Sequence, residues 1–212
     1  MTYGVLAIWN DCAQGHEAAY EAWYMREHLP ERLSLPGFRR VRRYGAVRPG
    51  PEFFTYYETD SAEVLATADY IERVEDPTPM TRQIMSGVFL NMNRTVCHVV
   101  GRVGYARGSF AAVLRMAEAP PDPNLKAVLA ELNGQDGIAR AEAWRAAEND
   151  VTADNAEAKL RGGDDQIGAC LFIETLREKD ADRALGLIAA RHPGVPGIYR
   201  LLCEVTAEEM PA

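Results

Sequence analysis

The sequence predicts an α+β fold made of two βαββαβ halves whose antiparallel sheets pack face to face. Three observations lead to this prediction. Strand-like and helix-like segments follow one another in the order β-α-β-β-α-β, and this order occurs twice in the 212 residues. The length suits two small units of about 100 residues each. Hydrophobic residues make up 47% and charged residues 25% of the chain, which is ordinary for a protein that buries a full core.

In the first half, short runs of β-branched and aromatic residues predict strands, and apolar residues three or four positions apart predict helices. Pro30 is expected to disturb or end the first helix near His28. The run Asp-Pro-Thr-Pro at 76–79 breaks the second helix. The expected elements are a strand at 4–10, a helix at 17–28, strands at 38–44 and 53–58, a helix after Ser61, a helical stretch at 82–92 and a strand at 96–105.

The second half repeats this order of elements. Its expected strands are 109–117, 138–146, 167–175 and 198–205, and its expected helices are 123–133, 154–160 and 180–191. The run Gly-Phe-Arg-Arg at 37–40 is echoed by Gly-Ile-Ala-Arg at 137–140, and the pair Glu-Thr at 58–59 is echoed at 174–175. We therefore predict a tandem duplication. The first half is 1–107, with an inserted helical segment near 76–93, and the second half is 108–212.

A βαββαβ half is the ferredoxin-like arrangement, in which both helices lie on one face of a four-stranded antiparallel sheet. The other face of that sheet is apolar and uncovered. Two such faces can cover each other within one chain, which produces a small α/β barrel or sandwich. The interior of the barrel, or the clefts between sheet and helices, can hold a ligand.

The acidic composition limits the partners that we expect. Lys and Arg number 23 and Asp and Glu number 31, so the formal net charge is −8, which argues against nonspecific binding to nucleic acid or anionic lipid. The apolar run at 4–10 is too short for a signal peptide core or a membrane span. The four cysteines are widely spaced and suit a reducing compartment. We expect a cytoplasmic protein that binds neither nucleic acid nor a membrane.

Several signatures of catalysis and cofactor binding are absent from the sequence. It has no glycine-rich dinucleotide fingerprint, no P-loop, no nucleophile elbow and no His-Glu-x-x-His. The four histidines are scattered without metal-ligand spacing. We therefore expect no metal site and no cofactor.

The densest group of chemically active side chains lies at 23–33, in the run Trp-Tyr-Met-Arg-Glu-His-Leu-Pro-Glu-Arg-Leu. His28 suits proton transfer near neutral pH, and Glu27, Glu31 or Arg32 could tune it. The structural alternative is that a histidine near a helix C-terminus bonds the free carbonyls and interacts with the helix dipole. Both interpretations of His28 remain open at the level of sequence.

The arginine-rich strand at 38–44 points its charges in two directions. Arg40 and Arg42 lie on one face, and Arg39 and Arg43 lie on the other. One pair must therefore face packed protein or a cavity, where a buried arginine needs a carboxylate or an anionic ligand group. The structural alternative is a surface strand paired with acidic residues such as Glu52 or Glu58. The aromatic strand that follows, at 53–57, is either core or the wall of a pocket.

Part of the chain resembles a known family. Trp23, the run at 27–32, the Pro-Gly-Phe turn at 36–38 and the Arg-Arg-Tyr strand at 42–44 are similar to the first half of an uncharacterised bacterial family. That family belongs to the dimeric α/β-barrel superfamily, near the EthD-like and antibiotic-biosynthesis-monooxygenase-like proteins. The run at 76–81 is similar to its loop after the second helix, where an aromatic residue is more usual than Met80. Over the second half the resemblance rests on element order alone.

The resemblance implies a barrel of paired ferredoxin-like sheets and leaves the activity open. Members of the superfamily include cofactor-independent monooxygenases, isomerases, cyclases, haem-binding enzymes and proteins with no known activity. By this resemblance, His28 occupies the position of the histidine at the helix end in EthD-like proteins.

Two functions from different classes follow. In the first, the chain is a cofactor-independent enzyme of the monooxygenase, isomerase or cyclase type that acts on an apolar or aromatic substrate. His28 is then the catalytic acid or base, and the substrate-binding residues are Trp23, Arg42, Arg43, Tyr56 and Tyr57. In the second, the chain is a non-catalytic binding or assembly protein in which the same residues are structural. The expected partners are a small-molecule ligand and a second copy of the chain in a homodimer.

Overall fold

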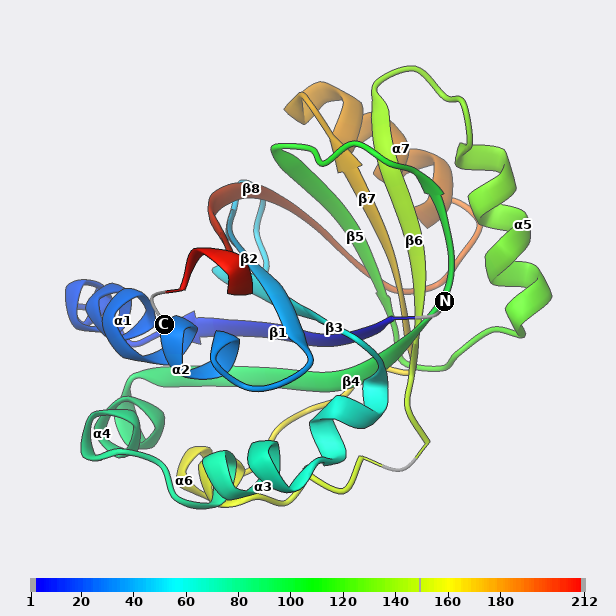
Figure 1. Ribbon diagram of the computed structural model, residues 1–212. Coiled ribbons are helices and arrows are strands. Elements are labelled where there is room, and N and C mark those ends of the chain that lie inside the picture. Colours follow the sequence, from blue (N-terminus) through cyan, green and yellow to red (C-terminus); the bar gives the residue numbers. More distant parts are fainter. Residues whose placement is uncertain (1–2, 149, 211–212) are drawn as a thin grey trace.

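The computed structural model describes residues 3–148 and 150–210, which form an eight-stranded closed barrel with helices packed on its outside (Figure 1). This confirms the predicted α+β fold, with antiparallel sheets closed as an α/β barrel. Met1, Thr2, Asn149, Pro211 and Ala212 fall within the two predicted halves but lie outside the described residues. The strands are β1 (Gly4–Cys12), β2 (Phe38–Ala46), β3 (Phe53–Thr59), β4 (Phe89–Gly104), β5 (Phe110–Met116), β6 (Ile138–Ala146), β7 (Ala169–Thr175) and β8 (Val195–Thr206).

Each half of the chain contributes one four-stranded sheet to the barrel. The strand order is β1-β3-β2-β8-β5-β7-β6-β4. The two sheets meet where β2 pairs with β8 and where β4 pairs with β6, and both pairings are antiparallel. Closure therefore leaves neither sheet with a free edge. The barrel is complete within one chain, so a second copy is not needed to close it.

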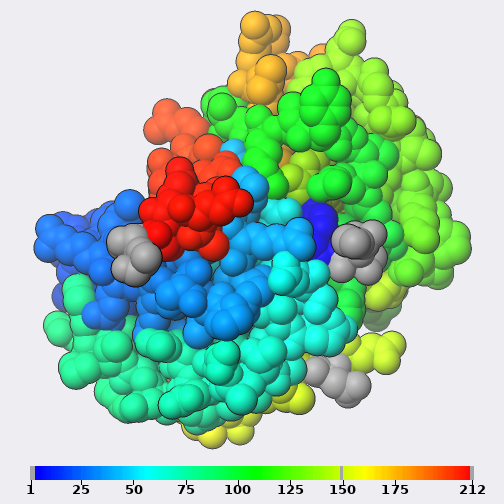
Figure 2. Space-filling view, viewed as in Figure 1, coloured from blue at the N-terminus to red at the C-terminus, as the bar shows by residue number. Residues whose placement is uncertain are grey.

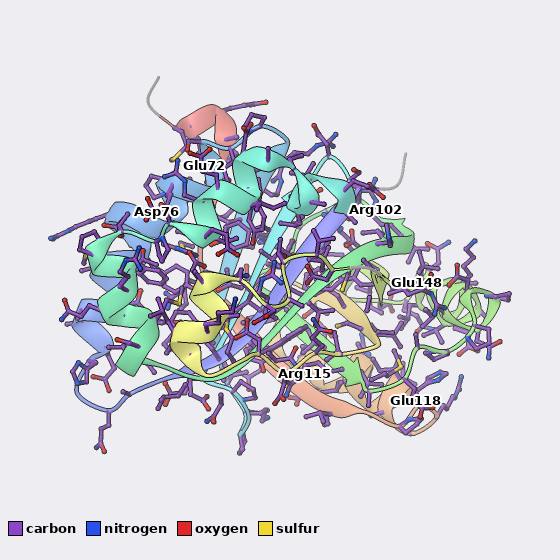
Figure 3. All side chains as sticks on the ribbon, turned by 90° about the horizontal axis from the view of Figure 1, so that it is seen from below. Glu72, Asp76, Arg102, Arg115, Glu118 and Glu148 are labelled. Atoms are coloured by element: carbon purple, nitrogen blue, oxygen red, sulfur yellow. The ribbon has the colours of Figure 1, made fainter. Side chains whose placement is uncertain are left out.

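The helices lie on the outer face of the barrel. They are α1 (Glu17–Trp23), the π-helical turn η1 (Tyr24–His28), α2 (Leu29–Leu33), η2 (Ala62–Ala66), α3 (Ala68–Glu75), α4 (Pro79–Gly87), α5 (Asp122–Leu132), α6 (Ala156–Arg161), α7 (Glu178–Ala189) and η3 (Ala207–Glu209). The C-terminal end of the chain lies over the N-terminal half (Figure 2). By sequence α6 belongs to the second half, yet it packs beside α3 and α4 of the first, as the view from below shows (Figure 3). Among the described residues, no helix is long and apolar enough to cross a membrane.

The first helix does not end at Pro30. The helical path continues from α1 through η1 into α2, where Pro30 is the second residue. In η1 the amide of Leu29 donates to the carbonyl of Tyr24, five residues back. A proline in a regular α-helix clashes with the carbonyl four residues earlier, and the wider π turn relieves that clash. Pro30 disturbs the helix, as predicted, but the expectation that it could end the helix near His28 is wrong.

The helical stretch predicted at 82–92 is too long. Helix α4 ends at Gly87, and β4 begins at Phe89, where Phe89 and Leu90 pair with Cys12 and Asp11 of β1. The backbone groups at this end of β1 need partners, and strand pairing there outweighs the helical spacing of the apolar residues. The predicted inserted helical segment near 76–93 is therefore helical only over α4, and its last residues belong to the barrel.

Aromatic rings and charged side chains fill the barrel interior. The large rings form one cluster, which contains Trp9, Tyr44, Phe54, Tyr56, Trp144, Phe172 and Tyr199. Four arginines and four glutamates from both halves make ion pairs beside these rings, and they are Arg40, Arg42, Arg107, Arg140, Glu58, Glu142, Glu174 and Glu204. The interior is therefore a packed core with matched charges.

The two motifs that recur in the sequence occupy equivalent places in this interior. Arg40 lies opposite Glu58 in the β2–β3 pairing, and Arg140 lies opposite Glu174 in the β6–β7 pairing. The glycine that precedes each strand has a positive φ, 86° at Gly37 and 80° at position 137, a conformation that glycine adopts without strain. The division into halves at residue 107 and the tandem duplication remain predictions.

Candidate functional site

A small cavity lies between the outer face of the first sheet and the helices that cover it. Its volume is about 20 Å³, which is room for about one water molecule. The apolar part of its wall consists of Leu6, Ile8, Met85, Phe89 and Met92. The polar part consists of Tyr24, His28, Arg32, Tyr57, Tyr70, Arg94, Glu157 and Arg161. Apolar walls with a few convergent polar groups are typical of small-molecule sites.

The π-helical turn places His28 in this wall. His28 is only 4% exposed, and its ring stacks on Trp23 with 4.2 Å between centroids. The ring of Tyr24 meets it edge-on at 5.4 Å. A hydrogen bond fixes the position of the Trp23 ring, whose Nε1 donates to Thr81 Oγ1 at 3.0 Å. Packing thus fixes the orientation of the imidazole, and π turns of this kind occur frequently at functional sites.

Four polar groups of the cavity wall lack a hydrogen bond within the described part of the chain. They are Nδ1 of His28, the hydroxyls of Tyr24 and Tyr57, and Nη1 of Arg32. A buried polar group without a partner is costly and rare in folded proteins. Four such groups around one cavity point to a site that a ligand or ordered water completes.

The protonation states of these groups follow from their burial. Burial, together with the positive charges of Arg32, Arg161 and Arg43, lowers the pKa of His28 well below its ordinary value of 6.5. Burial raises the pKa of Tyr57 well above 10.0. At neutral pH the cavity therefore contains an unprotonated imidazole that can accept a proton, beside a tyrosine and an arginine that can donate hydrogen bonds.

The lowered pKa of His28 predicts a loss of stability in mild acid. Below pH 6.5 His28 is protonated in the unfolded chain but stays neutral in the folded protein. Acid therefore favours the unfolded chain, and the free energy of unfolding falls as the pH falls. Between pH 7 and pH 5 this loss is at most about 2 kcal/mol. The measurement is urea unfolding of wild type and His28→Gln at both pH values. The free energy of unfolding should fall less in the variant than in wild type on acidification, and an equal fall in both proteins would contradict the assignment.

The second half of the chain supplies counter-charges at the cavity. Arg32 forms an ion pair with Glu157 of α6, and both side chains are buried. Arg94 of β4 donates to Asp150 Oδ2 at 2.8 Å and to Thr152 Oγ1 at 2.7 Å. The site is therefore built from both halves, because residues of the β6–β7 connection cross over the first half.

Of the six predicted site residues, the structure brings three together. His28 and Tyr57 line the cavity, and Trp23 lies directly behind His28. Arg43 is on the same side of the sheet, but it is held between aromatic rings, with its guanidinium carbon 4.3 Å from the Tyr24 ring centroid. It also binds Glu21 at 2.7 Å.

The other two predicted residues face the barrel interior. Arg42 pairs there with Glu174 and Glu204. The hydroxyl of Tyr56 accepts a hydrogen bond from Arg107 Nη1 at 3.1 Å. The alternation of strand residues separates Arg42 from Arg43 and Tyr56 from Tyr57, so each neighbouring pair has one member on each face of the sheet.

Sequence reasoning named Arg32 only as a group that could tune His28, and it missed the other polar wall residues, which are Tyr24, Tyr70, Arg94, Glu157 and Arg161. Tyr24 and Arg32 lie four positions before and after His28, and that helical spacing is a signal that could have placed them on its face. Arg94 carries a weaker signal, a charged residue inside a strand. Glu157 and Arg161 carry none, because no local pattern shows that α6 packs on the other half.

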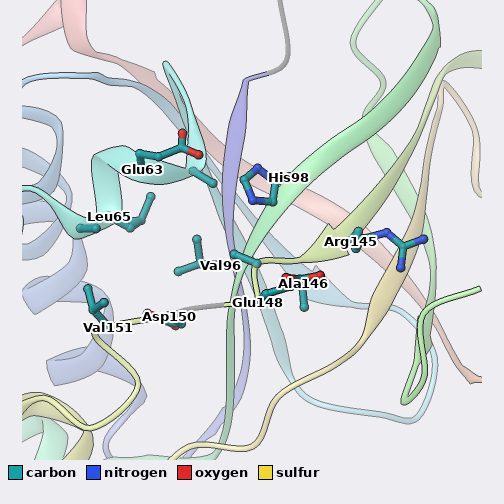
Figure 4. A pocket seen from close by; sticks show the side chains of 12 residues that line it. Glu63, Leu65, Val96, His98, Arg145, Ala146, Glu148, Asp150 and Val151 are labelled. Atoms are coloured by element: carbon teal, nitrogen blue, oxygen red, sulfur yellow. The ribbon is translucent and has the colours of Figure 1, made fainter. Parts of the chain in front are cut away.

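A larger and more open groove lies on the other side of the Arg94–Asp150 contact. Its volume is about 410 Å³. Glu63 and Leu65 of η2 face Val96 and His98 of β4, with Asp150 and Val151 near them (Figure 4). Arg145, which also lines the groove, is already bound to Asp122 and to the carbonyl of residue 120. Among the described residues, no side chain of the groove has a buried polar atom without a hydrogen bond, whereas four such atoms line the cavity. The cavity is therefore the candidate site.

The fold is shared with solved structures of low sequence identity. An anthrone oxidase-like protein matches with a TM-score of 0.62 and 12% identity over 100% of this chain and 95% of its own. A protein of Fusobacterium nucleatum described as a candidate monooxygenase has a TM-score of 0.59 and 9% identity, with coverage of 96% and 94%. A protein described as a candidate chlorite dismutase has a TM-score of 0.55 and 13% identity, with coverage of 96% of both chains.

These likenesses extend over the whole barrel, so the chain shares its α/β-barrel fold with these proteins. At such low identity they establish the fold alone. No protein-family model matches the sequence, and no curated protein matches it. Within the described residues, no group of three or more His, Cys, Asp or Glu side chains is placed to hold a metal ion.

Proposed function

We propose that this barrel binds a small apolar or aromatic molecule that carries an enol or phenol group at the His28 cavity, and that it acts on this molecule as a cofactor-independent, oxygenase-type enzyme. The observation that carries the proposal is the grouping of an unprotonated imidazole, whose Nδ1 has no hydrogen bond, with three donors that also have none: the hydroxyls of Tyr24 and Tyr57 and Nη1 of Arg32. The names of the anthrone oxidase-like and monooxygenase-like neighbours support the same class of reaction.

The proposed chemistry assigns a role to each group. Neutral His28 takes a proton from the substrate, and Tyr57 and Arg32 donate hydrogen bonds to the oxygen on which negative charge develops. The substrate anion then transfers electrons to O₂. With anthrone as substrate, the CH₂ carbon gains one oxygen atom and becomes a carbonyl, and its two hydrogens leave with the other oxygen atom as water. Leu6, Met85 and Phe89 supply an apolar surface for the ring system.

The alternative is a non-catalytic binding or assembly protein. The cavity volume of about 20 Å³ favours it, because this space holds no organic ring without a rearrangement of the wall. The two functions differ in turnover. A binding protein holds the aromatic probe without consuming O₂, whereas the proposed enzyme consumes one O₂ for each molecule of anthrone oxidised. A homodimer, a cytoplasmic location and the absence of nucleic acid partners remain part of the proposal.

Two neighbouring tyrosines provide a matched test of the binding site. Tyr57→Phe removes a hydroxyl that has no partner in the described part of the chain, whereas Tyr56→Phe removes one that binds Arg107 on the opposite face of the sheet. We expect Tyr57→Phe to weaken binding of anthrone about tenfold and to leave stability unchanged or raise it by up to about 1 kcal/mol. Tyr56→Phe should lower stability by about 1 kcal/mol and leave binding unchanged.

The measurements are the fluorescence change on titration with anthrone and the free energy of unfolding in urea. Native mass spectrometry of protein purified without added ligand would identify a metabolite that the cavity retains. Equal anthrone affinity in wild type and Tyr57→Phe would rule out the hydroxyl of Tyr57 as a ligand contact. If the protein with anthrone consumes O₂ no faster than buffer with anthrone, the enzymatic function is ruled out and the binding function remains.

A further inference from the structure

One wall of the His28 cavity comes from a connection that belongs to the second half. We use the name strap for residues 150–161, which lie between β6 and β7 and include α6. Glu157 and Arg161 of the strap line the cavity, and Asp150 and Val151 line the open groove. The strap therefore lies between a narrow space of about 20 Å³ and a wider, more open one of about 410 Å³.

The walls of the cavity differ in what holds them. The sheet is part of a closed barrel. The helical wall from α1 to α2 is anchored by large buried side chains, which are Tyr20, Trp23, Tyr24, Leu29 and Leu33. The strap buries far less apolar surface, because Ala158 is buried, Leu160 is only partly buried and Val151 is 64% exposed. Segments with few buried apolar contacts open at the lowest free energy.

Polar contacts hold the strap at its first residue, Asp150, and in α6. Asp150 binds Arg94 at 2.8 Å, and both side chains are at least nine-tenths buried. Glu157 binds Arg32. When the strap lifts, water solvates both members of each pair, so opening leaves no buried charge uncompensated. Such contacts close the wall and still permit it to open.

The flanks of the strap are fixed to β4 on both sides. The amide of Ala147 donates to the carbonyl of Val96 at 2.8 Å, and the amide of Asp165 donates to the carbonyl of Met92 at 2.9 Å. A segment with fixed flanks and polar contacts between them can move outward and return to the same position.

We propose that the strap is a lid over the His28 cavity, and that the Arg94–Asp150 ion pair is its latch. Opening joins the cavity to the groove, which then serves as the entrance for a ligand too large for the closed cavity. The role of the lid in admitting a substrate rests on the proposed function. The opening itself does not depend on that function.

The latch can be weakened without disturbing the turn around it. Oδ1 of Asp150 accepts hydrogen bonds from the amide and the hydroxyl of Thr152, at 2.9 and 2.6 Å, while Oδ2 binds Arg94. Asp150→Asn retains the first oxygen and removes the charge that neutralises Arg94. The matched control is Asp122→Asn, which removes the partner of Arg145 elsewhere on the rim of the groove.

The readout is the rate at which diethylpyrocarbonate modifies His28, followed by mass spectrometry on the ligand-free protein. His16 and His98 are exposed and provide reference rates in the same molecule. His28 should react slowly in wild type and in Asp122→Asn, and about tenfold or more faster in Asp150→Asn. Cys97 and Cys170, which are fully buried in the barrel interior, should stay unreactive toward a thiol reagent in all three proteins.

Two results would overturn the proposal. One is an unchanged rate at His28 in Asp150→Asn. The other is reaction of His28 together with the two thiols, which would show that the cavity opens only when the whole barrel unfolds. The assay contains no substrate, so a faster rate at His28 supports the lid even if anthrone does not bind. Loss of anthrone binding in Tyr57→Phe likewise tests the proposed function independently of the lid.

Discussion

Replacing Glu174 with glutamine is expected to lower the free energy of unfolding by about 3–5 kcal/mol, a large part of the 5–15 kcal/mol typical of a folded domain. Glu174 is fully buried in the barrel interior and pairs with Arg42 of β2, and it accepts a hydrogen bond from the Tyr44 hydroxyl at 3.2 Å. Glutamine has nearly the same shape but no charge. The substitution therefore leaves Arg42 buried with less compensating charge.

The control for Glu174→Gln is Asp60→Asn, which removes an exposed ion pair with Arg39. Solvent screens that pair, so the control should cost at most about 1 kcal/mol. Urea unfolding of both variants measures the difference. The double variant Arg42→Met, Glu174→Gln should lose less than the sum of the two single variants, because the charge that Glu174→Gln leaves uncompensated is then absent. Strictly additive losses would show that Arg42 and Glu174 do not interact energetically across the barrel.

Replacing His28 with glutamine is expected to reduce turnover of anthrone by about 10²–10⁴-fold, the contribution typical of a positioned acid or base. The reason is local, since His28 is the unprotonated, unpartnered base of the cavity. Glutamine occupies a similar volume against Trp23 and cannot take up a proton. The measurement is the rate of O₂ consumption with anthrone, corrected for the reaction in buffer.

A purely structural His28 leads to the opposite outcome. In that case His28→Gln lowers the melting temperature, because stacking on Trp23 is lost, while anthrone binding and any O₂ consumption stay at the wild-type level. His16→Gln is the matched control, since His16 is exposed and lines neither the cavity nor the groove. Equal turnover in His28→Gln and His16→Gln would show that His28 is not the catalytic base.

Strand alternation illustrates which features of the site the sequence predicts and which it does not. It separates Arg40 and Arg42 from Arg43, and the structure places the first two toward the barrel interior and the third toward the helices. The pattern could not say which face was which, because both faces of this sheet are buried, one against the helices and one inside the barrel. For the same reason Tyr56 and Tyr57 could not be sorted into a core residue and a cavity residue.

The first helix shows a different limit. The dense run around His28 could be read directly, and so could the disturbance caused by Pro30, because both are local. The π turn could not be read, since a single wide turn depends on how Trp23 and Tyr24 pack beneath the helix as well as on the proline. That turn decides that His28 is buried in a continuous helix and faces the cavity.

The sequence by itself predicted the order of elements and the antiparallel sheets of each half, because these follow from periodicity and turn residues. It also singled out the run around His28 by its local composition. It also contained the repeated Arg–Glu pairs of the barrel interior as a faint internal echo. The tertiary structure alone decided what closes the cavity. Glu157 meets Arg32 across 125 positions of sequence, and such a contact depends on how the two halves pack. No local pattern of residues encodes a partner at that distance.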